Sequence, residues 1–252
     1  MATGESVENR IRALYGDEPL ERAGVVHIVA TWRAPDASLC VIRVGPGSPH
    51  STTDQFALRS ARMRADAIIT TGKILRDEPE LAHDEFDPEL LAWRREGQGR
   101  PLPTLTTILT SGRDLDFDHP LFGRVPPPLV VVPGENQKSV EARARAAGAD
   151  VEVLGRDAAG LRDTLSLLAE RGFENLLVEA GPSTTRELYE AVPAVDELWL
   201  SVFEEPELGG AYIGEAFADA AQLRATFDQT STPTIRTEES GRWSFQRLWR
   251  TA

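Results

Sequence analysis

The chain has 252 residues, of which 41% are hydrophobic and 27% charged, as is ordinary for a soluble globular protein with one substantial core. Its formal net charge of -13 argues against nucleic acid or an anionic membrane as the main partner, because both attract an excess of Lys and Arg. The single cysteine, Cys40, excludes an intrachain disulfide framework and a cysteine-rich zinc site.

The N-terminal segment is polar and acidic, and its apolar residues Val7, Ile11 and Leu14 recur at helical spacing. We predict a peripheral helical extension over residues 1–24 and one domain over residues 25–252. No apolar run reaches the roughly 20 residues that span a bilayer, and the start lacks the basic-then-apolar pattern of a signal peptide. The sequence therefore predicts a cytoplasmic protein that does not contact membranes.

Strand and helix patterns then alternate. The runs 25–32 and 38–44 predict a β-hairpin around residues 33–36. Residues 51–54 offer N-cap chemistry to a helix that carries Arg62 and Arg64 on or beside its polar face.

A short buried strand is predicted from Ala67, followed by a helical turn that stops near Pro79. Residues 83–103 are rich in charge, Gly and Pro, which predicts an exposed excursion anchored by Leu90, Leu91 and Trp93.

The second half of the chain repeats the pattern of a strand followed by a helix. Strands are expected at 104–110, 128–133, 151–154 and 175–178, and helices at 139–148 and 161–172. This succession predicts an α/β fold with a mostly parallel central sheet and helices on both faces. The strand-like runs at 197–203, 223–229 and 242–249 have few helices between them and predict an antiparallel C-terminal edge.

The most informative motif is NLLVEAGPSTT, residues 175–185, in which a buried strand ends at Glu179. Gly181 permits a tight turn, and Pro182 with the next two hydroxyl residues opens a helix. The free backbone N–H groups of that helix start favour an anion such as the phosphate of a nucleotide cofactor. A strand-to-helix turn without a ligand explains the motif equally well.

Six segments, in order, resemble the reductase domain of bacterial riboflavin-biosynthesis deaminase-reductases. They include ADAIITTGKILRDEPEL, TILTSGRDLDFDHPLF, LLVEAGPSTTRELYEAVPAVDELWLSV and PELGGAYIG. The match runs from about residue 25 to the C-terminus and implies a single dihydrofolate-reductase-like domain. It also implies hydride transfer from NADPH to the ribosylamino carbon of a phosphorylated aminopyrimidine, by a homodimer.

The resemblance implies three cofactor-binding segments. They are Thr71, Gly72 and Lys73; Ser111 and Arg113; and Gly181, Pro182, Ser183 and Thr184. Arg113 would meet the extra phosphate that separates NADPH from NADH.

On the substrate side, the resemblance implies binding by Asp77, Leu81 and Glu179, with the two acids also taking catalytic roles. Ordinary structural roles compete with each assignment. Asp77 sits in a charge-rich turn that water can solvate, and Glu179 can serve as a favourable charge at a helix N-terminus.

The sequence departs from the family at several positions. Residues around Trp32, the turn at Lys73 and the run 82–84 differ, and the last of these replaces an arginine with Ala-His-Asp. The substrate end has thus diverged more than the cofactor end, and a catalytically inactive binding or assembly protein of the same fold is the alternative.

No zinc deaminase motif is present, which indicates a stand-alone reductase. The four histidines show no ligand spacing, so we predict no metal and expect each histidine to be structural or solvated. The aromatic run WSFQRLW, residues 243–249, suits either a self-association surface or a buried core strand.

Overall fold

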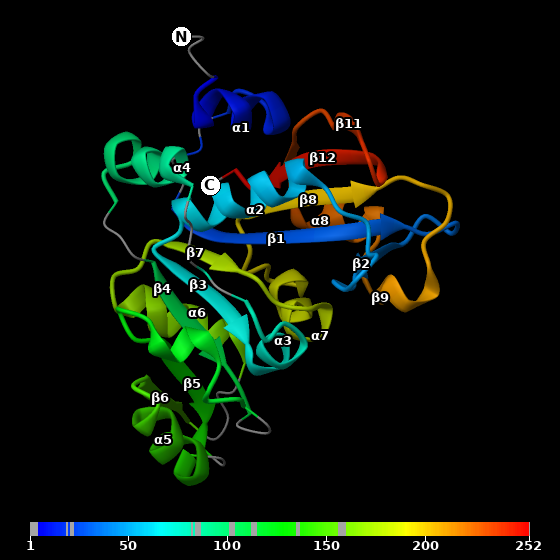
Figure 1. Cartoon of the computed structure of the whole chain (residues 1–252). Helices are drawn as coiled ribbons and strands as arrows, with labels where there is room; N and C mark the ends of the chain where they lie inside the picture. Colours follow the sequence, from blue (N-terminus) through cyan, green and yellow to red (C-terminus); the bar gives the residue numbers. More distant parts are fainter. Residues whose placement is uncertain are drawn as a thin grey trace. The chain divides into compact units, whose positions relative to one another are not determined.

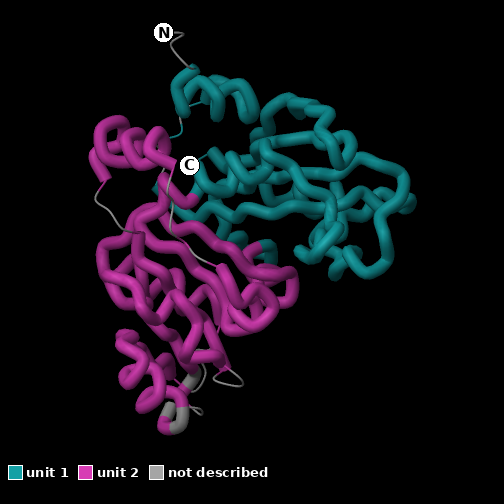
Figure 2. The backbone as a smooth tube through the Cα atoms, in the orientation of Figure 1, with its two compact units in different colours: residues 1–61, 189–252 teal, residues 62–188 magenta. Residues whose placement is uncertain are grey.

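The computed structural model describes residues 5–18, 20, 23–81, 83, 87–100, 104–111, 115–134, 137–155 and 160–251. The chain forms two compact units, shown in Figure 2. Unit 1 contains residues 1–61 and 189–252, and unit 2 contains residues 62–188. The division into an extension and one domain at residue 24 stays a prediction.

In unit 1, two long strands run parallel to each other at the centre: β1 (Gly24–Arg33) and β8 (Glu197–Phe203). On one side β12 (Gly241–Trp249) joins β8 in antiparallel fashion and pairs in turn with β10 (Gln229–Thr230) and β11 (Thr234–Glu238). On the other side β2 (Leu39–Ile42) forms the predicted hairpin with β1, and β9 (Ile213–Ala218) pairs with β2.

The core of unit 1 is aromatic. Every residue of β8 is buried, and the β12 side chains Trp243 and Phe245 are at most 1% exposed. Of the two explanations for residues 243–249, the structure therefore supports the buried core strand. Helix α1 (Val7–Tyr15) belongs to the same core, because its Tyr15 ring lies 4.5 Å from that of Trp199.

One predicted strand is wrong. Residues 223–229 were expected to be strand-like, but most of them lie in helix α8 (Ala220–Thr226). The carboxylate of Asp219 accepts the backbone N–H groups of Ala221 and Gln222, each at 2.8 Å. This N-cap favours a helix from Ala220, and the helix buries the side chain of Leu223. The β propensity of residues 223–229 is too weak to prevent helix formation. A 3-10 turn, η5 (Gly210–Tyr212), precedes β9.

Unit 2 is built on five parallel strands paired in the order β7-β3-β4-β5-β6. Their bounds are β3 (Ala67–Thr71), β4 (Leu105–Leu109), β5 (Leu129–Pro133), β6 (Asp150–Leu154) and β7 (Asn175–Val178). The predicted α/β class, with parallel strands at its centre and an antiparallel C-terminal edge, is confirmed.

The connections of unit 2 are mostly helical. They are α3 (Gly72–Asp77), α4 (Pro88–Ala92), the π-helix η1 (Trp93–Gly97), the 3-10 turn η2 (Pro120–Gly123), α5 (Gln137–Ala146) and α6 (Leu161–Glu170). Helix α7 (Pro182–Thr185) follows β7 and continues as the 3-10 turn η4 (Arg186–Tyr189). Helix α2 (Thr52–Arg64) leads from unit 1 into unit 2. In Figure 1, α3 begins at the arrowhead of β3.

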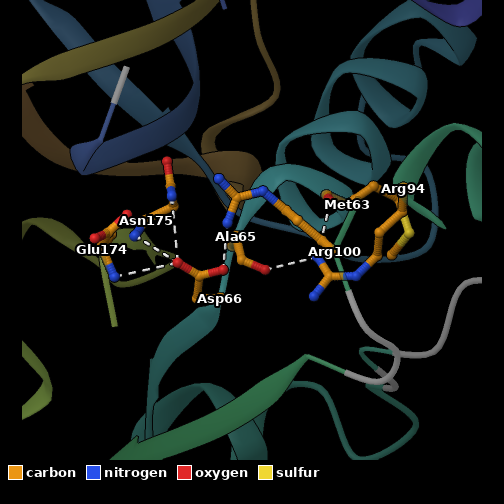
Figure 3. A network of polar contacts seen from close by, with 7 residues as sticks. All are labelled: Met63, Ala65, Asp66, Arg94, Arg100, Glu174 and Asn175. Carbon is orange, nitrogen blue, oxygen red and sulfur yellow. Dashed lines mark hydrogen bonds and ion pairs between the residues drawn. The ribbon is translucent and has the colours of Figure 1, made fainter. Parts of the chain in front are cut away.

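The amino-terminal ends of β3 and β7 are tied together by Asp66, as Figure 3 shows. Its carboxylate accepts the backbone N–H groups of Glu174 (3.1 Å) and Asn175 (2.9 Å), the Asn175 side-chain amide and the Arg100 guanidinium. Partial burial opposes ionisation of this group, but the donors outweigh it and lower the pKa of Asp66.

The excursion at 83–103 is more deeply anchored than its composition predicts. Leu90 is buried as expected, but the charged side chain of Arg94 is also only 1% exposed. Arg94 donates to the carbonyl oxygens of Met63 (2.8 Å) and Ala65 (2.7 Å), which lie at the end of α2 (Figure 3). The arginine thus satisfies carbonyl groups that a helix C-terminus leaves without partners.

Candidate functional site

The carboxyl-terminal ends of β3, β4 and β7 lie at one edge of unit 2, since these strands are parallel and adjacent. Ile69 is opposite Val178, and the backbone N–H of Glu179 still donates to the Ile69 carbonyl at 2.9 Å. This pairing brings Glu179 to the same edge as the turn between β3 and α3. Open α/β sheets bind ligands at such an edge.

Glu179 is held by Arg62 in a bidentate ion pair. Arg62 Nε lies 2.8 Å from Oε1, and Nη2 lies 2.7 Å from Oε2, with both side chains about one-tenth exposed. Burial alone would raise the pKa of Glu179, but the charge and hydrogen bonds of Arg62 outweigh burial and lower it. Glu179 is therefore an anion at neutral pH and a poor proton donor.

Arg62 and Arg64 were expected on or beside the polar face of their helix, and this is wrong. Their exposed fractions are 8% and 6%. For Arg62 the reason is Glu179, a partner 117 residues later in the sequence.

His83 also lies beside Glu179. Its ring is buried, with Nδ1 3.1 Å from Thr106 Oγ1 on β4 and Nε2 3.7 Å from Glu179 Oε2. Among the described residues, Nε2 has no hydrogen-bond partner. Burial is the main reason that the pKa of His83 falls to about 4, so the ring is neutral at pH 7. Its sequence neighbours Ala82 and Asp84 lie outside the described residues.

The start of α3 holds the other predicted residues of this edge. Thr71 is the N-cap, and its hydroxyl accepts the N–H of Ile74 at 3.3 Å. Gly72 is tightly packed, because a Cβ atom there would lie 2.8 Å from Thr110 Oγ1. Gly72 thus has a packing role whether or not it contacts a cofactor.

Lys73 and Asp77 pair with each other on the outside of α3. Their charged atoms are 2.6 Å apart, and the side chains are 66% and 56% exposed. The next acid, Glu78, is half-buried, and its pKa is raised by burial and by the charge of Glu179, while Arg62 opposes the shift. Leu81 packs against the apolar cluster that contains Leu75 and Ile108.

The loop from Gly181 to Thr184 has a different backbone from the one predicted. Gly181 has φ −71° and ψ 166°, which any residue adopts, so the turn does not require glycine. A Cβ atom at this position would meet nothing within 4 Å.

Some backbone N–H groups at the start of the helix after Gly181 are already hydrogen-bonded within the chain. Thr184 and Thr185 both donate their N–H groups to the Gly181 carbonyl at 3.0 Å, and Pro182 has no N–H. Within this loop, the N–H groups of Gly181 and Ser183 are therefore the ones left to make the predicted contact with a diphosphate.

The remaining predicted cofactor contacts follow β4. Ser111 is exposed, and Arg113 lies outside the described residues. Glu179 therefore contacts Arg62 and His83 and acts electrostatically on Glu78, and none of these three residues was predicted for the site from the sequence. His83 does belong to the run 82–84 where the chain departs from the family, and that departure was the available signal.

The described residues include no group of three or more His, Cys, Asp or Glu side chains arranged to hold a metal. Within the same residues, none of the helices combines the length and apolar composition of a membrane span.

Comparison with known proteins gives a likeness of fold. No protein-family model and no curated protein sequence matches the chain. Among solved structures, it is similar to a pyrimidine reductase-like protein from Corynebacterium diphtheriae, at 21% sequence identity and a TM-score of 0.72. That match covers 98% of this chain and 100% of the other.

Two further solved structures, a RibD protein and a riboflavin biosynthesis reductase, are similar to the chain. RibD of Acinetobacter baumannii matches 91% of this chain with 58% of its own length, at 16% identity and a TM-score of 0.59. Riboflavin Biosynthesis Reductase Rib7 of Saccharomyces cerevisiae matches 95% of this chain with 96% of its own, at 16% identity and a TM-score of 0.54. The chain therefore has the fold of these reductases, as the resemblance in its sequence implied.

Proposed function

We propose that this chain is an NADPH-dependent reductase that acts on a phosphorylated ribosylaminopyrimidine or a related heterocycle. The observation that carries the proposal is the fold likeness to a pyrimidine reductase-like protein over 98% of this chain and all of the other. The motifs around residues 71–81 and 175–185, read from the sequence, support the same conclusion independently.

A reduced nicotinamide would supply the hydride, so the protein has to bind the cofactor and the substrate, orient them toward each other and exclude water. The residues that would hold the cofactor are the loop at Gly181–Thr184, the turn at Thr71 and Gly72, Ser111 and Arg113. Gly181 fits this role, because the space beside its Cα is open to an approaching ligand although its backbone does not need glycine.

Glu179 would bind the heterocycle. A carboxylate has about four lone-pair sites, and Arg62 takes one on each oxygen. The remaining sites accept N–H groups of an aminopyrimidine. Because Arg62 keeps Glu179 ionised, we assign to Glu179 the binding and orientation of the substrate. The homodimer implied by the family resemblance remains part of the proposal.

The first experiment measures the thermal shift of the purified protein with NADPH and with NADH. We expect a rise in Tm with NADPH, because a ligand that binds only the folded state stabilises it. Gly181→Val should fold normally and lose most of this shift, because its side chain would occupy the space open to the cofactor. Glu179→Ala should keep the NADPH response and lose the response to a pyrimidine such as 5,6-diaminouracil.

A wild-type protein without any response to millimolar NADPH would refute the reductase proposal. Oxidation of NADPH in the presence of a ribosylaminopyrimidine would eliminate the alternative of an inactive binding protein. If Gly181→Val binds NADPH as the wild type does, the loop at Gly181–Thr184 is not the diphosphate site.

A further inference from the structure

Arg94 is a deeply buried charge of unit 2. It belongs to the π-helical turn η1, and the residue is only 1% exposed. A buried charge is costly unless it is hydrogen-bonded, and π-helical turns are rare and frequently lie at functional sites. The contacts of Arg94 therefore indicate what its burial achieves.

These contacts hold the last turn of α2. A single nitrogen of Arg94, Nη1, donates to the carbonyl oxygens of Met63 at 2.8 Å and Ala65 at 2.7 Å (Figure 3). Ala65 in turn donates its N–H to the Arg62 carbonyl at 3.3 Å. Because hydrogen bonds from a charged donor are stronger than those from a neutral one, Arg94 fixes the main chain directly after Arg62.

Arg62 connects this anchored main chain to Glu179. Its Nε and Nη2 atoms contact the two carboxylate oxygens of Glu179 at 2.8 and 2.7 Å. Two parallel hydrogen bonds of this kind require the planar guanidinium to face the carboxylate, so they depend on where the main chain places Arg62. A continuous path therefore runs from Arg94 through the end of α2 to the carboxylate of Glu179.

We propose that Arg94 is a positioning residue of the reductase. By holding the end of α2, it aligns the Arg62 guanidinium with Glu179 and so fixes the direction in which that carboxylate meets the substrate heterocycle. The inference rests on the proposed function, because it extends the substrate-binding role assigned to Glu179. Arg94 acts through Arg62 and takes no part in the hydride transfer.

Arg94 is held in place by its own segment, residues 87–100. Leu90 of α4 is buried, and the backbone N–H of Arg100 donates to the Arg94 carbonyl at 3.0 Å. The Arg100 guanidinium binds the carboxylate of Asp66 (Figure 3). The position of Arg94 is therefore supported by contacts that are separate from those it makes with α2.

The ionisation of Glu179 reports on this path without any cofactor. In the full chain labelled with carboxyl-13C glutamate, Glu179→Gln identifies the Glu179 resonance. Burial opposes the ionisation of Glu179, but Arg62 outweighs it and lowers the pKa, so the wild-type signal should keep its carboxylate position from about pH 8 to about pH 5. Arg94→Met removes the donor to α2, and we expect Glu179 to take up a proton within this window.

Two further titratable groups interact with Glu179, and both are kept in every variant. Burial lowers the pKa of His83 to about 4, so its ring stays neutral in this window, and Glu78 is the second group. Arg62→Met should raise the midpoint of Glu179 by about 1–3 pH units, because it removes the opposite charge outright. Arg94→Met should produce part of that shift.

The chain offers a matched control in the same segment. Arg100→Met removes the ion pair with Asp66 and leaves the contacts of Arg94 with α2 in place. It should lower the stability toward urea and leave the titration of Glu179 as in the wild type. Arg94→Lys should restore part of the wild-type behaviour, because both carbonyl oxygens accept from one nitrogen, which an ammonium group can replace.

A double variant tests whether Arg94 acts through Arg62. In the Arg62→Met background, Arg94→Met should add no further shift to Glu179. An additive shift, or a wild-type titration of Glu179 in Arg94→Met, would overturn the proposal. If Arg94→Met does not fold, Arg94→Gln and Arg94→Lys take its place, and a wild-type titration in both has the same consequence.

Binding and turnover test the functional consequence. We expect Arg94→Met to keep the rise in Tm with NADPH, to lose most of the response to 5,6-diaminouracil and to lower kcat/KM by up to about 10²-fold, because the substrate is misaligned. Arg94→Lys should regain part of both losses. An equal loss of the NADPH and pyrimidine responses would show that Arg94 only stabilises the fold.

The two proposals fail in different ways. If the wild type shows no response to NADPH, the reductase proposal is wrong, and the titration of Glu179 still decides whether Arg94 acts on it through Arg62. If the wild type binds NADPH and turns over but Arg94→Met behaves like the wild type, only the role of Arg94 is wrong.

Discussion

Two acidic residues lie at opposite ends of the neighbouring strands β3 and β7 in unit 2. Asp66 precedes β3, and Glu179 follows β7. Asp66 accepts two backbone N–H groups, a side-chain amide and a guanidinium, so its carboxylate is well satisfied by the protein. Glu179 accepts only from Arg62 among the described residues, with an unpartnered His83 nitrogen 3.7 Å away.

The difference is what we expect between a structural carboxylate and the ligand-binding carboxylate that we propose at Glu179. A buried polar network whose members are all satisfied fixes one conformation, whereas leftover hydrogen-bonding capacity has to be explained by a ligand or by another role. Variants at the two ends should therefore affect different properties. The amino-terminal end should control stability, and the carboxyl-terminal end should control binding.

The largest effect on stability is expected from Asp66→Ala. Two backbone N–H groups and Arg100 lose their acceptor, which should lower the free energy of unfolding by about 2–5 kcal/mol in urea titration. Asp66→Asn keeps one carbonyl oxygen and should lose less. An equal loss of stability in both variants would show that the charge, and not the set of hydrogen bonds, is what matters.

The pH dependence of stability should reveal the buried His83. Its pKa is about 4 in the folded chain and 6.5 when unfolded, so only the unfolded chain binds the proton between these values. The free energy of unfolding therefore has its full value above about pH 6.5. It decreases by about 3 kcal/mol as the pH falls from there toward 4.

Urea titrations at several pH values, on the wild type and on His83→Gln, measure this difference. The variant has no imidazole and should lack the decline in the window between pH 6.5 and 4. The lowered pKa of Glu179 acts below its ordinary value of 4.5, so its own loss of stability falls at more acidic pH. Parallel curves for the two proteins would show that His83 is not buried in the neutral form.

The smallest effects on stability are expected from alanine substitutions at two glycines of the carboxyl-terminal edge, Gly72 and Gly181. Gly72→Ala should cost about 1–3 kcal/mol, because the new Cβ would lie 2.8 Å from Thr110 Oγ1. Gly181→Ala should change stability by less than about 0.5 kcal/mol, because its Cβ meets nothing, while it weakens NADPH binding. If Gly181→Ala is the more destabilising of the two, the open space beside Gly181 is not present in solution.

Much of the fold could be predicted from local patterns. Buried runs of β-branched and aliphatic residues located the parallel strands β3 to β7, because such runs suit strands that are covered on both faces. The failure at residues 223–229 has a local cause as well. The Asp219 cap sits four residues before Leu223, outside the run that was read as a strand.

The candidate site was only partly predictable. Glu179 was identified because it ends a buried strand before a Gly-Pro turn, a pattern that is visible within eleven residues. Arg62 and His83 were not, because their partner lies 117 and 96 residues later in the chain, and sequence spacing carries no information about such contacts. The same limit applies to Asp77 and Glu78, which are adjacent in sequence but differ in burial.

The sequence by itself determined the α/β class, the order of strands β1 to β8 along the chain and the edge at which Glu179 would lie, since these follow from hydrophobic period and turn chemistry. Only the tertiary structure decided which charges and how much solvent surround each acid at that edge. Arg62 keeps Glu179 ionised, Lys73 pairs with Asp77 in solvent, and Glu78 is left half-buried without a cation of its own among the described residues. Burial and the distance to neighbouring charges set a pKa, and both are properties of the folded chain.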